Sequence, residues 1–373
     1  MNRTRTIAFY CGSLNKGGAE RVFVNLAEYF NKKGYQVYMV TQYELENEYR
    51  ISNSITRVIS DLTDKELKRS RIVNFVSRLI KLRDIFLRIQ PDVVLSCFGK
   101  NNMMSVVANA FTKCKVVVSV VADPKMEYYT GFMRLLAKLL FRFADGIVLQ
   151  TKEAKSFFPK GIQKKAIILP NSVNAKFIKP PFEGERKKEI VAVGRLDTNK
   201  NHAMLIEAFS RIASRFPEYK VVIYGDGPER ENLLQLISEK DLDTKVTLAG
   251  VVTDIENKIY ESSLFVMTSD TEGMPNALLE AMSMGLPVIC TDCPCGGPGE
   301  IIVHGENGYL FPVRDTNQLA SLLEMCLENP SKTDEMGKNA SKIQHTMDPE
   351  TVNQAWEAYF IEVMEHGKRQ RAV

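Results

Sequence analysis

The sequence predicts an α/β protein of two doubly wound domains, each a parallel sheet with helices on both faces. Three observations lead to this fold class. The chain has 373 residues, which is too long for one compact core. Short β-branched runs alternate with longer helical stretches along the chain. The alternation starts again after a segment rich in Pro, Asn and charge, "PNSVNAKFIKPPFEGERKKE".

The two halves show the same order of elements. The strands predicted in the first half are "TIAFYC", "YQVYMVT", "ITRVIS", "DVVLSCF", "KVVVSVVA", "GIVLQ" and "KAIILP", with helices near 19–33, 66–89, 100–112 and 131–143. Those predicted in the second half are "IVAVGR", "KVVIYG", "KVTLAG", "LFVMTS" and "LPVICT", with helices near 200–215, 229–240, 253–261, 276–284 and 316–329. Two such domains, divided near Asn171, are expected to face one another across a cleft, with ligands beyond the carboxyl ends of the strands.

Composition narrows the class of protein. A hydrophobic content of 45% and a charged content of 25% are those of a soluble globular protein. The net charge of +4 is too small to indicate nucleic-acid binding. Seven scattered cysteines favour a reducing, cytoplasmic compartment over a disulfide framework. The start, "MNRTRTIAFYCGSL", is expected to be a first strand rather than a secretory signal, and no apolar run approaches the roughly 18 to 20 residues that cross a bilayer.

Glycines follow the first predicted strand. Gly17 and Gly18 precede a helix that is expected to open at Ala19. Such a turn presents backbone N–H groups and the positive end of the helix dipole, which suits an anion. A plain tight turn explains the same residues equally well, since the spacing matches neither a dinucleotide fingerprint nor a Walker loop.

Two cations follow the first strand of the second half. Arg195 comes directly after "IVAVG", and Lys200 lies at the start of the next predicted helix. Together they could hold a diphosphate, the arginine through its planar fork and the lysine as a point charge. The alternative is a pair of solvated surface charges.

The stretch "TEGMPNALLEAM" follows the strand "LFVMTS". We expect Pro275 at the first helical position, so that the first-turn N–H groups point at a ligand. Glu272 lies before this helix and Glu280 about one turn inside it, so the two acids address different parts of one ligand. Glu280 stands among apolar residues, where a carboxylate needs hydrogen-bond donors. Ribose hydroxyls would serve, and so would a Lys or Arg of the fold.

Four motifs, in order, are "GGAER", "VGRLDTNKN", "GDGPER" and "TEGMPNALLEAMSMGLPVI". With "PNSV", "DCPCGGPGEII" and "NGYLFP", they resemble the family-4 retaining glycosyltransferases of the GT-B fold over nearly the whole chain. The likeness is greatest to bacterial members that build capsule, exopolysaccharide or O-antigen repeats. It implies two Rossmann-like domains: residues 1–171 on the acceptor side, with a C-terminal helix at about 350–366 packed back on them, and residues 172–349 holding the donor.

The resemblance also implies roles for single residues. Arg195 and Lys200 match the pair that neutralises the diphosphate of a nucleotide-sugar donor. Glu272 matches the acid that contacts the hydroxyls of the donor sugar, and Glu280 the acid that binds ribose. The other implied donor contacts are Gly17, Gly18, Gly273, Met274, Pro275, Asn276, Ala277 and Leu278.

No metal or other cofactor is expected for a reaction that proceeds with retention at the anomeric carbon. The D-x-D sequence Asp241-Leu-Asp243 is expected at a solvated helix end rather than at a manganese site. Cys290, Cys293 and Cys295 have a spacing similar to zinc ligands, but a closed site needs a fourth ligand, for which His304 is the sole candidate considered, and no metal is expected.

Two adjacent positions depart from the family pattern. Related sequences often carry Glu and then His or Arg after the fifth strand, where this chain has Val120 and Val121. Asp123 is the one nearby polar candidate on the acceptor side. The departure indicates either a different substrate or weakened activity, and Val121 motivates one alternative to a transferase, a non-catalytic nucleotide-sugar-binding partner subunit of another glycosyltransferase. A further alternative is a sugar-nucleotide epimerase of the same fold.

Two segments mix basic and apolar residues at helical spacing, "DKELKRSRIVNFVSRLIKLRDIFLRI" and "GFMRLLAKLLFRF". They indicate either helices that lie on an anionic membrane or core-facing helices with a basic outer face. The expected partners are a UDP-linked sugar donor, a polysaccharide or lipid-linked acceptor, a membrane contact and a partner glycosyltransferase, without nucleic acid. The expected location is the cytoplasm, at the inner face of the cell membrane.

Overall fold

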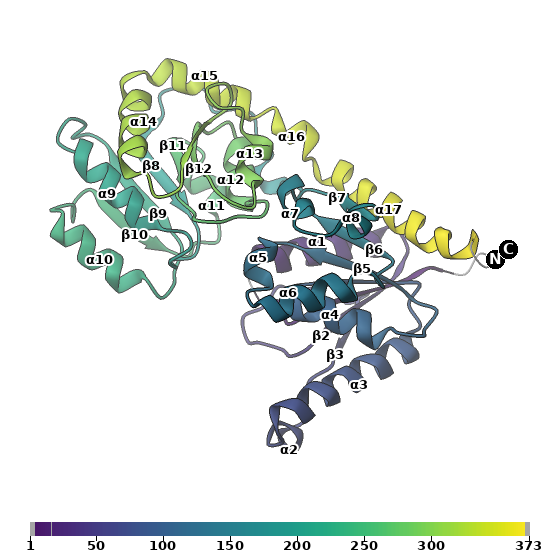
Figure 1. Cartoon of the computed structure of the whole chain (residues 1–373). Coiled ribbons are helices and arrows are strands. Elements are labelled where there is room, and N and C mark those ends of the chain that lie inside the picture. Colours follow the sequence, from purple (N-terminus) through teal and green to yellow (C-terminus); the bar gives the residue numbers. More distant parts are fainter. Residues whose placement is uncertain (1–3, 16, 370–373) are drawn as a thin grey trace. The chain divides into compact units, whose positions relative to one another are not determined.

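A computed structural model describes residues 4–15 and 17–369, with side chains up to Glu365. The chain divides into two compact units (Figure 1). Unit 1 comprises the described residues of Met1–Asn171 and Glu350–Val373, and unit 2 comprises Ser172–Pro349. Each unit contains one parallel sheet with helices on both faces. The predicted α/β class with two doubly wound sheets is confirmed.

The sheet of unit 1 has the strand order β3-β2-β1-β4-β5-β6-β7, and all its pairs are parallel. Every residue of the central strand β1 is buried, because both faces of the sheet are covered. Its strands are β1 (Thr6–Cys11), β2 (Gln36–Thr41), β3 (Thr56–Ile59), β4 (Val93–Cys97), β5 (Lys115–Val120), β6 (Gly146–Leu149) and β7 (Ala166–Ile168).

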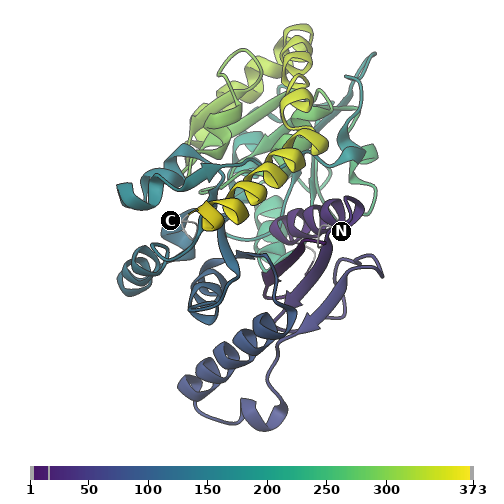
Figure 2. The same ribbon diagram turned by 90° about the vertical axis from the view of Figure 1, so that its right-hand side faces the viewer.

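The helices of unit 1 are α1 (Gly18–Lys32), α2 (Asp64–Leu67), α3 (Arg71–Ile89), α4 (Gly99–Ala108), α5 (Pro124–Glu127), α6 (Gly131–Leu140), α7 (Lys152–Ser156), α8 (Lys160–Gln163) and α17 (Pro349–Arg369). Helices α1 and α17 share the core on one face of the sheet, and α3 and α4 pack on the other face. Figure 2 shows α17 beside α1, where the rings of Phe30 and Phe360 stack with centroids 5.2 Å apart. Ile147 donates its backbone N–H to the Tyr359 hydroxyl over 2.9 Å, which fixes α17 to the sheet.

The single helix predicted near 66–89 is wrong, because the segment forms two helices, α2 and α3. Ser70 ends the connection between them with an extended backbone (φ −60°, ψ 153°). Its hydroxyl accepts the backbone N–H of Val73 over 3.4 Å, as an N-cap does. The cap starts a new helix, so the charged stretch before it does not continue into α3.

The sheet of unit 2 has the order β10-β9-β8-β11-β12-β13, again with parallel pairs. Its strands are β8 (Lys187–Val193), β9 (Lys220–Tyr224), β10 (Val246–Gly250), β11 (Ser262–Met267), β12 (Val288–Asp292) and β13 (Tyr309–Pro312). The edge strand β13 was not among the predicted strands. It is four residues long and ends in a proline, which an edge position tolerates.

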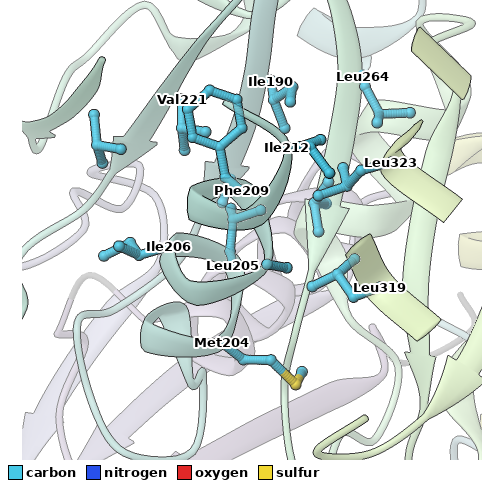
Figure 3. Packing of buried hydrophobic residues seen from close by; sticks show 14 of the residues in the cluster. Ile190, Met204, Leu205, Ile206, Phe209, Ile212, Val221, Leu264, Leu319 and Leu323 are labelled. Atoms are coloured by element: carbon cyan, nitrogen blue, oxygen red, sulfur yellow. The ribbon is translucent and has the colours of Figure 1, made fainter. Parts of the chain in front are cut away.

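The helices of unit 2 are the 3₁₀ helix η1 (Ala175–Phe177), α9 (His202–Ile212), α10 (Arg230–Glu239), α11 (Ile255–Lys258), α12 (Asn276–Ser283), α13 (Gly297–Ile301), α14 (Thr316–Glu328), α15 (Pro330–Ala340) and α16 (Ile343–Thr346). Helices α9, α10 and α14 bury their apolar sides on one face of the sheet. Figure 3 shows Phe209 of α9 and Leu323 of α14 in this core, with Leu264 of β11. Helix α12 packs on the opposite face.

Within the described residues, no helix is both long enough and apolar enough to cross a membrane.

Candidate functional site

The loops that follow β8 and β11 meet at the carboxyl edge of the second sheet, because these two strands are neighbours. Lys200 lies on the first loop and Glu272 on the second. The ammonium group of Lys200 donates a hydrogen bond to Oε1 of Glu272 and forms an ion pair with it. Thr268 also donates its hydroxyl to the carbonyl of Lys200 over 2.9 Å. The fold therefore joins two of the predicted site residues.

Further hydrogen bonds hold these loops together. Asp270 donates its backbone N–H to the carbonyl of Asn199 over 2.8 Å. The side-chain amide of Asn199 donates to the carbonyl of Thr271 over 3.1 Å. Within the first loop, Asp197 accepts the backbone N–H of Lys200 over 3.0 Å. The position of the Lys200 backbone is thus set by the fold rather than by a ligand.

Arg195 occupies the same loop as Lys200 but faces solvent. Its side chain is 70% exposed, and its Nε lies 3.9 Å from Oδ2 of Asp197. At that distance and exposure the attraction between the two groups is weak. The guanidinium can therefore turn onto an incoming anion at little cost.

A third loop, which follows β12, supports the Glu272 loop. The backbone N–H of Glu272 donates to the carbonyl of Pro294 over 2.7 Å. The carbonyl of Gly273 approaches Gly297 so closely that a Cβ on Gly297 would lie 1.5 Å from it. Only glycine at position 297 allows this approach of two backbones. This close approach explains why the loop after β12 has a glycine at position 297.

Helix α12 begins at Asn276, where the predicted range 276–284 also begins. Pro275 is the N-cap, with an extended backbone (φ −76°, ψ 110°), and its carbonyl accepts the N–H of Leu279 over 3.2 Å. The prediction that Pro275 is the first helical residue is therefore wrong. The first turn of α12 is still formed by Asn276, Ala277 and Leu278, as expected. Its dipole end favours negative charge.

Glu280 lies on α12 and is only 6% exposed. Its neighbours Leu279 and Ala281 are fully buried, and Met274 belongs to the same core. The side chain of Leu278 is also fully buried, so this residue can reach a ligand only through its backbone. Glu280 is therefore buried next to an apolar wall formed by these residues.

His202 was not singled out from the sequence. It is the first residue of α9 and is 5% exposed. Its ring nitrogens face the backbone of Gly194 and Arg195, yet neither forms a hydrogen bond of good geometry with a described residue. Burial, and then the charge of Lys200, lower the pKa of His202 to about 4. A neutral imidazole therefore supports the loop that carries Arg195 and Lys200. The only sequence signal was its place two residues after Lys200.

The Gly-rich turn of unit 1 leads directly into α1. Gly17 is the N-cap, and the helix begins at Gly18 rather than at Ala19. A Cβ on Gly17 would lie 2.3 Å from Oε2 of Glu20, so that carboxylate lies beside the turn. Burial raises the pKa of Glu20. The turn predicted to seat an anion thus already has an acid next to it.

The loop after β5 contains Val121, one of the two positions that depart from the family pattern. Val121 packs against the core of unit 1. Asp123 is buried and caps α5, where its Oδ1 accepts the N–H of Lys125 over 2.8 Å. Asp123 therefore already has a structural role.

Glu127 is a second residue that sequence reasoning missed. Its Oε1 accepts the backbone N–H groups of Val121 and Ala122, each over 2.8 Å. Its Oε2 is buried and has no hydrogen bond within the described part of the chain. Burial raises the pKa of Glu127 to about 7, although the two backbone donors lower it. No spacing in the sequence connects Glu127 with positions 121 and 122, so only the fold reveals this contact.

The three cysteines considered as zinc ligands are buried thiols. Burial raises the pKa of Cys290 and Cys293, which disfavours the thiolate that zinc requires. Among the residues that the structure describes, no three His, Cys, Asp or Glu side chains gather in a group that could hold a metal ion.

Two family models match the chain. The model described as Glycosyltransferase Family 4 matches residues 16–177, and the model described as Glycosyl transferases group 1 matches residues 173–343. Together they cover most of the chain. The chain therefore belongs to the family-4 glycosyltransferases of the GT-B fold.

Individual relatives and a solved structure agree with this class. An α-1,4-N-acetyl-D-galactosaminyltransferase of Campylobacter jejuni, named for an acceptor on PP-undecaprenol, is 24% identical over 96% of this chain and 98% of its own length. The amylovoran biosynthesis glycosyltransferase AmsD of Erwinia amylovora is 23% identical over 92% of this chain and 96% of its own length. The crystal structure of Anabaena HepE in complex with UDP has a TM-score of 0.81 at 18% identity, covering 96% of this chain and 100% of HepE.

Proposed function

We propose that this glycosyltransferase moves a sugar from a UDP-linked donor to a polysaccharide or lipid-linked glycan, with retention and without a metal ion. The observation that carries the proposal is the Lys200–Glu272 ion pair on the neighbouring loops after β8 and β11. Beside it lie the exposed Arg195 and the first turn of α12. Cations, an acid and a helix N-terminus at one sheet edge suit a phosphorylated sugar.

The positive groups would hold the diphosphate of the donor. Lys200 would contact it as a point charge and Arg195 through its fork, with the dipole of α12 adding to their field. As the bond to the sugar breaks, negative charge grows on the leaving diphosphate, and these groups stabilise it. Two cations would thus supply the charge that a divalent metal supplies in other transferases.

The two acids would bind the sugars of the donor. In the absence of a donor, Glu272 neutralises Lys200. We propose that the diphosphate takes over Lys200, and that the Glu272 carboxylate then accepts hydrogen bonds from the hydroxyls of the donor sugar. Glu280, held in the apolar wall of α12, would accept hydrogen bonds from the ribose hydroxyls. Backbone groups of the Gly273–Leu278 segment would complete the donor site.

The choice of UDP and of the acceptor rests on the comparisons. HepE was solved with UDP, the C. jejuni relative is named for an undecaprenol-linked acceptor, and AmsD for amylovoran biosynthesis. We extend these features to this chain, with the reaction at the cytoplasmic face of the membrane. Retention follows from the family resemblance.

The proposed roles in unit 1 are the donor-contacting turn of Gly17 and Gly18 and the acceptor-side acid Asp123. To these we add Glu127, whose carboxylate pins the backbone of Val121 and Ala122 and so positions the loop that carries Asp123. Glu127 acts through that loop, since its own carboxylate is buried.

Turnover of nucleotide sugars tests this function. Purified protein is incubated with a panel of nucleotide sugars and with membrane lipid extract, and released nucleoside diphosphate and labelled lipid product are measured. We expect both products, in equal amounts, from at least one UDP-sugar. The Lys200→Ala and Glu272→Ala variants serve as matched controls. Absence of product with every donor, despite binding, would contradict the proposal.

A second candidate is a non-catalytic nucleotide-sugar-binding subunit of another glycosyltransferase. The observation that favours it is Val121, which packs against the core of unit 1 where the family pattern has His or Arg. This candidate predicts donor binding without turnover until a partner enzyme is added. An epimerase would instead change the donor sugar without any acceptor.

A further inference from the structure

Unit 1 carries many large apolar side chains that no part of the unit covers. On α3, Ile72 is 78% exposed, and on and just after α6, Phe132 and Phe143 are 73% and 77% exposed. The further exposed members are Val73, Phe75, Val76 and Ile80 of α3, and Leu135 and Leu139 of α6. We call these nine residues the apolar surface. Isolated exposed apolar residues are ordinary, whereas a group of this size marks an interaction site.

The first half of α3 is exposed because it extends beyond the sheet. The buried apolar side chains of α3 are Leu82, Ile85 and Phe86, all in its second half. Figures 1 and 2 show α2 and the start of α3 as a projection from unit 1. Residues 72, 75, 76 and 80 follow helical spacing, so they form a stripe along this projection.

Helix α6 belongs to the same side of unit 1. Helices α3 and α6 both pack against α4, which covers the face of the sheet opposite α1 and α17. Helix α6 buries Ala137, while Phe132, Leu135 and Leu139 stay exposed. The two exposed parts therefore flank α4 on one side of the unit.

Basic side chains border the apolar stripe of α3. Lys65, Lys68, Arg69 and Arg71 are exposed at the α2–α3 junction, and none of them forms an ion pair with a described residue. We call these four residues the basic collar. By contrast, the half-buried cations Arg78 and Lys81 of α3 pair with Asp61 and Glu66. The cations without acidic partners thus lie next to the exposed apolar residues.

We propose that the apolar surface and the basic collar dock unit 1 on an anionic lipid bilayer. Apolar side chains would enter the boundary between headgroups and acyl chains, while the collar contacts lipid phosphates. A projecting helix suits insertion into lipid better than a groove-shaped protein contact. A second copy of the chain is disfavoured, because its collar would repel this one. The inference rests on the proposed function in one respect, that a lipid-linked acceptor lies in this membrane.

Vesicle binding by the whole protein tests this inference. We expect sedimentation with phosphatidylcholine vesicles that contain about one third phosphatidylglycerol, and at least about tenfold weaker binding to phosphatidylcholine alone. The double variant Ile72→Ser/Phe75→Ser and the charge variant Lys68→Glu/Arg69→Glu should each bind at least about tenfold more weakly. Val251→Ser in unit 2, which replaces an apolar residue of equal exposure, is the matched control and should bind like wild type.

A fluorescence measurement locates the contact. The single tryptophan, Trp356, is buried on α17, so Phe75→Trp in a Trp356→Phe background reports on α3 alone. Its emission should shift to shorter wavelength on anionic vesicles and be quenched by brominated lipid. Val251→Trp in the same background should show neither change. A Phe75→Trp emission that vesicles leave unchanged would overturn the proposal, as would equal binding of all variants or a concentration-dependent dimer in place of vesicle binding.

Nucleotide binding separates this inference from the proposed function. The docking variants should keep the wild-type affinity for UDP in solution, because their residues lie in unit 1 and the UDP-contacting acids and cations in unit 2. Vesicle binding without UDP binding would support the docking of unit 1 on a bilayer and contradict the proposed UDP-linked donor. UDP binding without vesicle binding would support the UDP-linked donor and contradict the docking.

Discussion

Lys200 and Glu272 are 72 residues apart in the chain, yet their side chains form an ion pair at the carboxyl edge of the second sheet. Each partner is mostly buried, and the backbone around each is held by hydrogen bonds to the other loop. A diphosphate that binds Lys200 must therefore compete with the Glu272 carboxylate for its ammonium group. The first prediction concerns this competition.

Glu272→Gln should tighten nucleoside-diphosphate binding while it slows sugar transfer. Without the carboxylate, Lys200 no longer has a neutralising partner, so UDP affinity should rise about fivefold, equal to about 1 kcal/mol. The transfer rate should fall about a hundredfold if Glu272 orients the sugar. Calorimetric titration of UDP and a turnover assay measure the two effects. Weaker UDP binding in this variant would show that Glu272 does not compete for Lys200.

Glu280→Ala should weaken nucleotide binding through the ribose. A UDP analogue without the 2′-hydroxyl provides the control, because it lacks one of the groups that Glu280 would bind. Wild type should bind UDP at least about tenfold more tightly than the deoxy analogue, and the variant should bind the two almost equally. Equal discrimination by both proteins would remove the ribose assignment. Circular dichroism checks that the variant keeps its fold.

His202 should make unit 2 less stable in acid. Its pKa is about 4 in the folded chain against an ordinary 6.5, so the unfolded chain takes up a proton first as the pH falls. Stability should therefore decline between about pH 6.5 and pH 4, by about 3 kcal/mol in total. Denaturant unfolding of wild type and His202→Gln across this range should show a flatter profile for the variant. His345→Gln, on an exposed residue of α16, should keep the wild-type slope.

Glu127 should have the opposite effect in unit 1. Its folded-state pKa is about 7 against an ordinary 4.5, so its contribution to stability is complete below about pH 4.5 and is lost as the pH rises to 7. Glu127→Gln removes the titration and should abolish this decline. Glu153→Gln, on an exposed residue of α7, is the control. If Glu127 also positions the Asp123 loop, its variant should raise the KM for acceptor and leave UDP affinity unchanged.

Most of the strands could be predicted, because a parallel sheet buried on both faces requires continuous β-branched runs such as "KVVVSV". The edge strand β13 was missed because it is only four residues long and directly follows two turn-forming residues, Asn307 and Gly308. The split between α2 and α3 depends on a single serine cap. A four-residue strand and a single capping residue change the hydrophobic periodicity of the sequence very little, so a prediction based on periodicity misses them.

The candidate site residues could be proposed from the sequence where a charged residue comes shortly after a predicted strand. Arg195, Lys200 and Glu272 each lie in a loop after a strand, and the order β8-β11 brings those loops together. The Lys200–Glu272 contact itself could not be read from the sequence, since it depends on that strand order. Glu127 and His202 were missed for a related reason: burial and backbone contacts across the fold, rather than spacing along the chain, decide what they do.

Calorimetric titration of UDP into wild-type protein and into Lys200→Ala and Arg195→Ala tests the donor site most directly. We expect saturable binding of one UDP per wild-type chain. Binding should be at least about tenfold weaker for Lys200→Ala and show an intermediate loss for Arg195→Ala, with melting temperatures in the absence of UDP close to wild type for the exposed Arg195 variant. Failure of wild type to bind UDP or any other nucleoside diphosphate, or equal binding by all three proteins, would contradict the proposed donor site.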